Sequence, residues 1–458
     1  MPRLSASGCT LAIALVATVS GGFGHSAGLS GPAAWTLAVT VFCALSWMSE
    51  CLPLPVTALV PLAVFPLVGV LSPDAVAQAY GNPIILLFLG GFLLSRAMES
   101  SGAHRRIALQ MMQLFGGSGR RMVFGFMLAA ALLSMWVSNT ATALMLLPVA
   151  LAIANESRGG PLALALLLAV AYGCSIGGLG TPIGSPPNLV FLQVYEQSTG
   201  ESLSFLQWMG YGLPVVIIML PLAALWLSRH VPAVAVVALP AVGPLTVAER
   251  RVLLIFGATA LAWMTRAEPW GGWSAWLNLP GANDASVALL GALLMFVLPD
   301  GRGQRLLSWE QAERIPWGML ILFGGGITIA AAFAQSGLSE VVGAQFTELA
   351  RLPLLLMIVT VAGVVIFLTE INSNTATAVL LLPVLAAAAL ALQIDPLLLM
   401  LPAALAASCA FMLPVATPPN AIVFGSGMVP IRVMVREGLA LNVLGLVVIS
   451  AWVYLRLG

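Results

Sequence analysis

Long apolar stretches separated by short polar segments run through almost the whole chain. From Leu11 to Leu455, apolar runs of about twenty residues recur, and each could cross the ~30 Å hydrocarbon core of a bilayer as a helix. The spans predicted in this way lie near 10–24, 33–49, 53–71, 83–102, 162–191, 208–228, 252–265, 286–299, 317–336, 397–425 and 438–455. The pattern therefore predicts an all-α polytopic membrane protein with about 11 transmembrane helices.

Composition excludes a soluble domain of this length. Hydrophobic residues make up 60% of the chain, charged residues only 8%, and the mean hydropathy is +1.03. The five cysteines have no paired spacing, so we expect small apolar packing residues rather than disulfides or a zinc site.

The chain contains an internal repeat. Residues 138–149 read SNTATALMLLPV and residues 373–384 read SNTATAVLLLPV, identical at ten of twelve positions with an offset of 235. The same offset aligns 82–102 with 317–337, and an offset of 232 aligns GSPPNLVF, from Gly184, with ATPPNAIVF, from Ala416. Three matches in the same chain order indicate a duplicated unit.

Arginine placement predicts that the two repeats are inverted. Every basic residue is an arginine, and the loop at 103–121 holds four of them against one in its repeat partner at 337–351. The loop at 300–316 holds three against none in its partner at 72–82. Because cytoplasmic loops accumulate positive charge, equivalent loops should lie on opposite sides of the membrane. The same rule predicts a cytoplasmic N-terminus and an external C-terminus.

A full crossing at either SNT segment would break this charge distribution, so both are predicted to be re-entrant hairpins. The expected organisation, in chain order, is an N-terminal transmembrane helix at 1–30, a first repeat at 31–230 with a hairpin at 122–155 and a broken helix at 162–191, a cytoplasmic linker at 231–251, and a second repeat at 252–458 with a hairpin at 353–393 and a broken helix at 397–425.

The polar motifs suit ion binding at the membrane midplane. Ser, Asn and Thr cap helix N-termini, so each SNT can start a returning half-helix whose N–H groups and positive dipole end face an anion. Paired prolines must interrupt their helices, and the freed carbonyls can bind a hard cation such as sodium. Serines that bond back to their own helix, and prolines that merely kink a span, are the alternative. Four motifs in duplicated positions favour two cation sites flanking one anion site.

These motifs resemble those of the divalent anion:sodium symporter family. Two SNT signatures, each followed by a PPN-type break, match the family over essentially the whole chain. The resemblance implies a homodimer in which each protomer has a fixed scaffold and a mobile transport domain. It also implies an elevator motion that carries the site across the membrane.

The resemblance also implies which residues form the sites. The anion site would comprise Ser138, Asn139, Thr140, Ser185 and Pro186 from the first half and Ser373, Asn374, Thr375, Thr417 and Pro418 from the second. Sodium site one would comprise Ser134, Ser138, Asn139 and Gly184, and sodium site two Thr369, Asn372, Asn374 and Ala416. Asn372 departs from the family pattern, where a small residue is common.

We therefore expect a sodium-coupled importer of C4 dicarboxylates such as succinate, malate or fumarate in the cell inner membrane. No arginine lies in the motif segments, so at least two sodium ions would have to neutralise the dianion. No organic cofactor and no nucleic acid partner are expected; the partners are the substrate, lipid and a second copy of the chain. A sodium-independent dicarboxylate exchanger and a sulfate or citrate transporter on the same fold remain alternatives. An enzyme would need a nucleophile with its base or a metal-ligand set, and no such pattern is present.

Three further features carry expectations. Glu370 adjoins Thr369 in an apolar segment and is either a cation or proton site or an acid with a satisfying partner. Arg96 and Glu99 are expected to pair on one helix. Tryptophans near predicted span ends, such as Trp35, Trp47, Trp208 and Trp317, are expected to form an interfacial belt.

Overall fold

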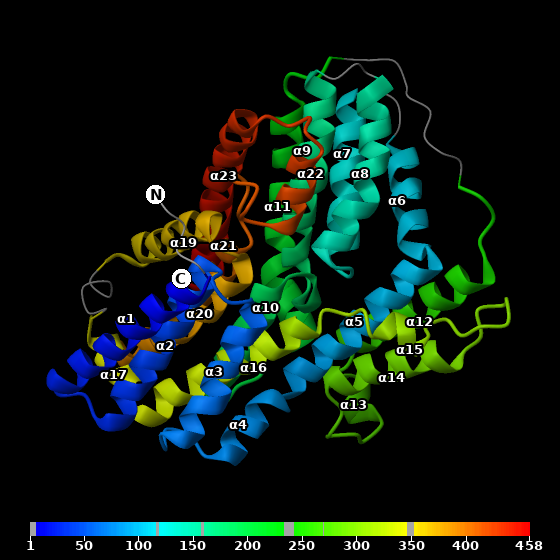
Figure 1. Cartoon of the computed structure of the whole chain (residues 1–458). Coiled ribbons are helices and arrows are strands. Elements are labelled where there is room, and N and C mark those ends of the chain that lie inside the picture. Colours follow the sequence, from blue (N-terminus) through cyan, green and yellow to red (C-terminus); the bar gives the residue numbers. More distant parts are fainter. Residues whose placement is uncertain (1–5, 116–118, 157–159, 233–241, 269, 346–351) are drawn as a thin grey trace.

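The structure is a computed structural model that describes residues 6–115, 119–156, 160–232, 242–268, 270–345 and 352–458 (Figure 1). Within these ranges the regular structure is helical, apart from one isolated bridge between Pro299 and Arg305. The predicted all-α fold class is confirmed.

The helices of the first half follow one another with short connections. They are α1 (Ala6–Ser26), α2 (Gly31–Ser49), α3 (Leu54–Leu67), α4 (Pro73–Tyr80), α5 (Pro83–Ser101), α6 (Ala103–Leu114), α7 (Gly119–Ser134), α8 (Asn139–Glu156), α9 (Pro161–Gly177), α10 (Pro186–Thr199) and α11 (Phe205–Ser228). Those of the second half are α12 (Val247–Met264), α13 (Gly272–Trp276), α14 (Asp284–Val297), α15 (Trp309–Ala312), α16 (Trp317–Ser336), α17 (Leu338–Gln345), α19 (Leu354–Ile371), α20 (Asn374–Ala391), α21 (Leu397–Ala407), α22 (Pro418–Gly425) and α23 (Ile431–Leu457).

Helices lie wherever spans or hairpins were predicted. Among the described residues, nine helices are long and apolar enough to cross a membrane, and four shorter apolar helices accompany them. Each predicted hairpin consists of two helices, α7 with α8 and α19 with α20, joined at an SNT motif. The hydropathy pattern missed the short helices α4, α6 and α17 because their polar residues interrupt the apolar runs.

The predicted linker at 231–251 lies partly outside the described residues, and its last residues are helical. Helix α12 starts five residues before the predicted span at 252, because a capping box fixes its first turn. Thr246 Oγ1 accepts a hydrogen bond from Glu249 N at 3.2 Å, and the Glu249 carboxylate accepts one from Thr246 N at 2.8 Å.

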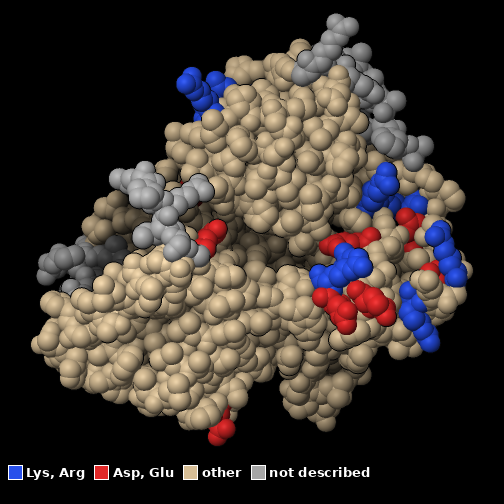
Figure 2. All heavy atoms as spheres, viewed as in Figure 1, with Lys and Arg blue, Asp and Glu red and all other residues tan. Residues whose placement is uncertain are grey.

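The helices form two groups that each combine both sequence repeats. In the view of Figure 1, α7, α8, α9, α11, α22 and α23 form an upper group, and α1–α5, α12, α14 and α16 lie across the lower part. Figure 2 shows a hollow between the two groups and a broad uncharged surface at the lower left, with charged side chains gathered at the right edge. A large uncharged surface is what a lipid-facing protein presents.

Two equivalent residues of the repeats meet inside the molecule. Phe88 of α5 and Phe323 of α16 are related by the offset of 235, and their rings stack with centroids 4.5 Å apart and an interplanar angle of 29°. Contact between a residue and its own repeat mate is expected where a two-fold axis relates two halves.

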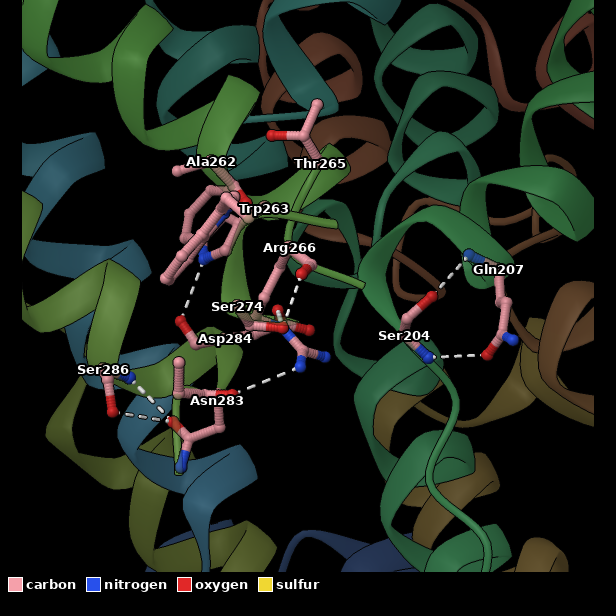
Figure 3. Close-up of polar contacts among 12 residues, drawn as sticks. Ser204, Gln207, Ala262, Trp263, Thr265, Arg266, Ser274, Asn283, Asp284 and Ser286 are labelled. Carbon is pink, nitrogen blue, oxygen red and sulfur yellow. Dashed lines mark hydrogen bonds and ion pairs between the residues drawn. The ribbon is translucent and has the colours of Figure 1, made fainter. Parts of the chain in front are cut away.

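Backbone and side-chain caps satisfy the helix ends around α12 and α14 (Figure 3). Trp263 Nε1 donates to Asp284 O at 2.9 Å, and Arg266 forms an ion pair with the Asp284 side chain. Asn283 Oδ1 accepts from Ser286 N at 2.8 Å and so caps α14. These contacts fix one end of the α12–α14 pair.

The side-chain expectations are partly confirmed. Arg96 and Glu99 pair at 2.8 Å, as predicted. Of the four tryptophans, Trp35 and Trp317 are 51% and 41% exposed, which fits the predicted belt. Trp47 and Trp208 are fully buried and donate to Leu54 O at 3.2 Å and Leu179 O at 3.1 Å, so the belt prediction was wrong for these two. Both are packing residues whose indole N–H binds a backbone carbonyl.

Helices α7 and α9 approach closely because α9 carries glycines. A methyl group at Gly173 would lie 2.7 Å from Met127 O, and one at Gly177 would overlap the Ala131 carbonyl. Spacing small residues by four places them on one helix face, which lets two backbones pack together in a membrane.

Replacing Gly177 with alanine should therefore destabilise the protein by about 1–3 kcal/mol, since the added methyl group must push α7 and α9 apart. Thermal unfolding of the detergent-purified protein would measure the loss. Gly257→Ala is the matched control, because a methyl group there meets nothing within 4 Å. Equal melting temperatures for the two variants would contradict the assigned contact.

Candidate functional site

Each SNT motif lies at the start of the second helix of its hairpin, α8 or α20. Ser138 Oγ accepts from Ala141 N and Ser373 Oγ accepts from Ala376 N, both at 3.2 Å, so the two serines cap α8 and α20. The predicted capping role of both motifs is confirmed. A capped start leaves neighbouring N–H groups and the positive end of the helix dipole available to an anion.

Each PPN motif begins a helix after an interruption. Helix α9 ends at Gly177 and α10 starts at Pro186, whereas α21 ends at Ala407 and α22 starts at Pro418. Proline fits the first helical turn because that turn needs no N–H donor. The interruptions at 178–185 and 408–417 occur where the paired prolines predicted them.

The asparagine of each PPN motif ties its interruption together. Asn188 Nδ2 donates to Gly178 O and Thr181 O, both at 2.8 Å. Asn420 Nδ2 donates to the repeat-equivalent carbonyls, those of Ala410 at 3.0 Å and Leu413 at 3.1 Å. Sequence reasoning assigned no role to either asparagine, although both motifs share this residue.

Three of the four residues predicted for sodium site one lie together. The Ser134 hydroxyl contacts Asn139 Oδ1 and donates to Cys174 O at 2.6 Å. A methyl group built on Gly178 would lie 3.1 Å from Gly184 O and 3.3 Å from Asn139 Oδ1. Oxygens of Ser134, Asn139 and Gly184 therefore surround the space beside Gly178, while the fourth residue, Ser138, caps α8.

The second half repeats this arrangement with different side chains. Thr369 Oγ1 lies 2.9 Å from Asn374 Oδ1 and 3.0 Å from Ala407 O, as Ser134 lies against Asn139 and Cys174. Asn372 turns back on its own backbone, since its Oδ1 accepts from Ser373 N at 3.0 Å. Ala416 lies in the interruption, where its N–H donates to Leu413 O at 3.3 Å.

Two pairs of repeat-equivalent oxygens are buried without a hydrogen-bond partner among the described residues. They are the Oδ1 atoms of Asn188 and Asn420 and the hydroxyls of Thr142 and Thr377. Amide and hydroxyl oxygens lacking a donor suit a hard cation such as sodium, and buried polar groups generally require a partner. Both interruptions thus have the chemistry that a cation site needs. Thr142 and Thr377 are the second threonines of the two SNTAT motifs, and the sequence prediction gave them no role although both motifs share this residue.

The residues predicted for the anion site are distributed around the two interruptions. Ser185 is buried, and its hydroxyl lies 2.9 Å from that of Ser408, so the two interruptions meet. Thr417 Oγ1 accepts from Asn420 N at 3.2 Å and caps α22. Pro186 and Pro418 occupy the first positions of α10 and α22. Thr140 is half-buried one residue into α8, and Thr375 is buried in the first turn of α20.

A small cavity lies beside the tip of the first hairpin. It has a volume of about 20 Å³ and is lined by Phe88, Gly91, Phe92, Ser95, Trp136, Ser138 and Ile183. This volume is close to that of a single water molecule, so a dicarboxylate would need more space. Helix α5 forms one wall and the hairpin tip with Ile183 forms the other.

The chain is similar over most of its length to known transporters. The family model described as citrate transporter matches residues 44–402. The chain is 40% identical over 451 residues to a sodium-dependent dicarboxylate transporter of Staphylococcus saprophyticus, covering 93% of this chain and 86% of that one. A protein of the same name from Staphylococcus aureus is 38% identical over 457 residues, covering 94% and 87%.

A solved structure is similar in fold. The crystal structure of the Alcanivorax borkumensis YdaH transporter, described as having an unusual topology, aligns with a TM-score of 0.58 and 15% sequence identity. The alignment covers 85% of this chain and 86% of that one.

Asn188→Ala and Asn420→Ala should each lower stability by about 2 kcal/mol or more, because each leaves two carbonyls of an interruption unpaired. Melting temperatures of the purified variants would measure this, with exposed Asn155→Ala as the control. We expect the two losses to be similar because the contacts are equivalent. Damage from only one of them would argue that the halves do not share this arrangement.

Proposed function

Because the chain belongs to the citrate-transporter family and, as its motifs predicted, to the divalent anion:sodium symporters, we propose that it imports C4 dicarboxylates such as succinate, malate or fumarate together with sodium. The family consists of transporters rather than enzymes. The observation that carries the proposal is the matched pair of oxygen clusters, Ser134 with Asn139 and Thr369 with Asn374, each beside a capped helix start. Relatives named as sodium-dependent dicarboxylate transporters support the same substrate and ion.

Sodium would bind at the two oxygen clusters, with at least one ion at each. Ser134, Asn139 and Gly184 would hold one ion, and Thr369, Asn374 and Ala416 the other, with Ser138 and Asn372 contributing through their backbones. When bound, sodium supplies the positive charge that the motif segments lack, since none of them contains an arginine. A dianion without this charge would be costly to bury, so coupling follows from local charge balance.

The anion would lie between the four helix starts at the motifs. Helices α8, α10, α20 and α22 all begin there, and N–H groups near Ser138, Ser185, Ser373 and Thr417 would bind the two carboxylates. Short hydroxyl and amide side chains, including Thr140 and Thr375, would complete the site. Pro186 and Pro418 keep the starts of α10 and α22 in place.

We propose further that the halves are inverted repeats and that transport uses an elevator motion. The stacking of Phe88 on Phe323 and the equivalent bonds of Asn188 and Asn420 support a two-fold relation between the halves. The mobile body would be α7–α11 with α19–α23, and the scaffold α1–α5 with α12–α17. Binding a dicarboxylate beside Ser138 would require α5 to separate from the hairpin tip, because the cavity there is only about 20 Å³. The protein would work as a homodimer in the inner membrane, with its N-terminus in the cytoplasm.

Uptake of radiolabelled succinate into proteoliposomes should require an inward sodium gradient. Replacing external sodium with choline should reduce uptake at least tenfold, because the uncompensated dianion loses more than about 1.4 kcal/mol of binding. A sodium-independent exchanger would instead show counterflow of succinate without sodium, and that result would refute the symport proposal.

Citrate is the second candidate substrate, since the matching family model is described as a citrate transporter. The same proteoliposomes would separate the candidates: unlabelled malate and fumarate should compete strongly with succinate, and citrate and sulfate weakly. Stronger competition by citrate would make citrate the preferred substrate.

A disulfide between α5 and the first interruption should arrest transport. The Cβ of a residue at position 91 would lie 3.8 Å from Ile183 Cβ, within the range of disulfide geometry. Oxidation of the Gly91→Cys/Ile183→Cys double variant should abolish uptake, and a reductant should restore it. The single variants, treated identically, are the controls. Full uptake by the cross-linked protein would rule out the proposed movement.

A further inference from the structure

Glu370 is a buried carboxylate beside the second oxygen cluster, and the proposed transport mechanism leaves it without a role. It follows Thr369 at the end of α19 and is only 3% exposed. Its Oε1 accepts from Phe411 N at 2.7 Å, Met412 N at 2.8 Å and Asn442 Nδ2 at 2.8 Å. Its Oε2 accepts from Leu413 N at 2.9 Å. Among the described residues all four partners are uncharged.

The three backbone partners of Glu370 belong to the interruption between α21 and α22. A break in a membrane helix leaves consecutive N–H groups without carbonyl partners, and burying them unpaired is costly. Glu370 satisfies the N–H groups of 411–413, while Asn420 binds the carbonyls of Ala410 and Leu413. The Glu370 side chain thus binds N–H donors of the interruption, and the Asn420 side chain binds carbonyl acceptors of the same interruption.

In the first half, no carboxylate of the described residues bonds to the interruption. The residue equivalent to Glu370 by the 235 offset is Met135, whose carbonyl accepts from the Thr181 hydroxyl. Glycines at 177, 178, 180 and 184 let this interruption fold into two 3₁₀ turns. There, Gly178 N bonds to Cys174 O and Gly184 N to Thr181 O. The second interruption, 408–417, contains no glycine. It keeps the equivalent of the second turn, since Ala416 N bonds to Leu413 O at 3.3 Å, but 410–412 forms no counterpart of the 3₁₀ turn Gly178–Gly180, so the donors there need an outside acceptor.

We infer that Glu370 is a positioning residue that holds 411–413 in place and thereby keeps the second oxygen cluster in shape for sodium. It acts through the backbone, since its oxygens are occupied by four donors. The two cation sites therefore differ: one depends on a fixed carboxylate and the other on glycine turns. As far as it concerns sodium, this inference rests on the proposed function.

Hydrogen exchange and sodium-dependent melting of the purified full-length protein test the inference separately. In Glu370→Gln the amide now presents a donor to the same N–H groups, so 411–413 should exchange faster in sodium-free buffer, with 178–184 unchanged. Titrating sodium against choline, the sodium concentration that gives half-maximal thermal stabilisation should rise about tenfold or more, the usual effect of losing a residue that orients metal ligands.

Glu437→Gln is the matched control, because Glu437 is also a buried carboxylate, 5% exposed, but its side chain bonds to Arg229, Arg436 and Trp226 instead of to the backbone of 411–413. It should keep the wild-type sodium midpoint. If Glu370→Gln does not fold, Asn442→Ala removes one of the four donors and should shift the midpoint in the same direction by a smaller factor.

Unchanged exchange at 411–413 together with an unchanged midpoint would overturn the inference, as would an equal midpoint shift in Glu437→Gln. If sodium fails to stabilise even the wild-type protein, the proposed function fails. The exchange of 411–413 then still decides whether Glu370 holds the interruption.

Discussion

The structure depends on satisfying the backbone polar groups of two broken helices inside a bilayer. Lipid offers no hydrogen-bond partner, so every N–H and C=O freed at 178–185 and 408–417 must be paired by the protein or by a bound ion. Asn188 and Asn420 each bind two of the freed carbonyls, and Glu370 binds three freed amides. Among the described residues, two pairs of buried side-chain oxygens stay unpaired at equivalent positions of the two halves: Oδ1 of Asn188 and Asn420, and the hydroxyls of Thr142 and Thr377. A helix break is stable in a bilayer only if few of its polar groups stay unpaired and these are held in fixed positions. Selective binding of an ion requires the same thing, a small number of unpaired oxygens in fixed positions.

The two repeats each contain a helix interruption, but different residues stabilise it in each repeat. The first interruption relies on glycine, whose missing side chain lets the backbone form compact turns and pack closely on its neighbours. The second has larger residues such as Phe411 and Met412 and relies on a buried carboxylate instead. Ser134 is likewise replaced by Thr369, yet both hydroxyls contact the asparagine of the following SNT motif. What the halves share is therefore an asparagine that pairs two carbonyls of the interruption, whereas the rest of each interruption is held in a different way.

Much of the fold could be predicted from sequence because the signals are local. Twenty-residue apolar runs located the long helices, and paired prolines located both breaks, since proline cannot donate the hydrogen bond that a continuing helix needs. Ser138 and Ser373 were predictable as caps for the same local reason. Ser408 and Asn442 were not predictable, because their partners, Ser185 and Glu370, are 223 and 72 residues away. The role of Glu370 was not predictable from the repeat either. The repeat aligns Glu370 with Met135, whose apolar side chain cannot accept the N–H groups of an interruption. The depth of Trp208 was misjudged because hydropathy cannot distinguish a helix face that packs on protein from one that meets lipid.

The position of the Glu370 carboxylate also bears on why a dianion would require sodium. Each helix start at the motifs contributes only a partial positive charge that falls off within the first turn, so the helix starts alone would not replace bound sodium. Glu370 places a further carboxylate beside the second oxygen cluster, and none of its four hydrogen-bond partners carries a positive charge. Without sodium the occupied site would therefore carry a net negative charge in a medium that solvates ions poorly. In its proposed role, the carboxylate that holds the second interruption would thus also disfavour anion binding until sodium is bound. One residue, Glu370, would then explain both how the second interruption is held and why sodium would bind before the anion.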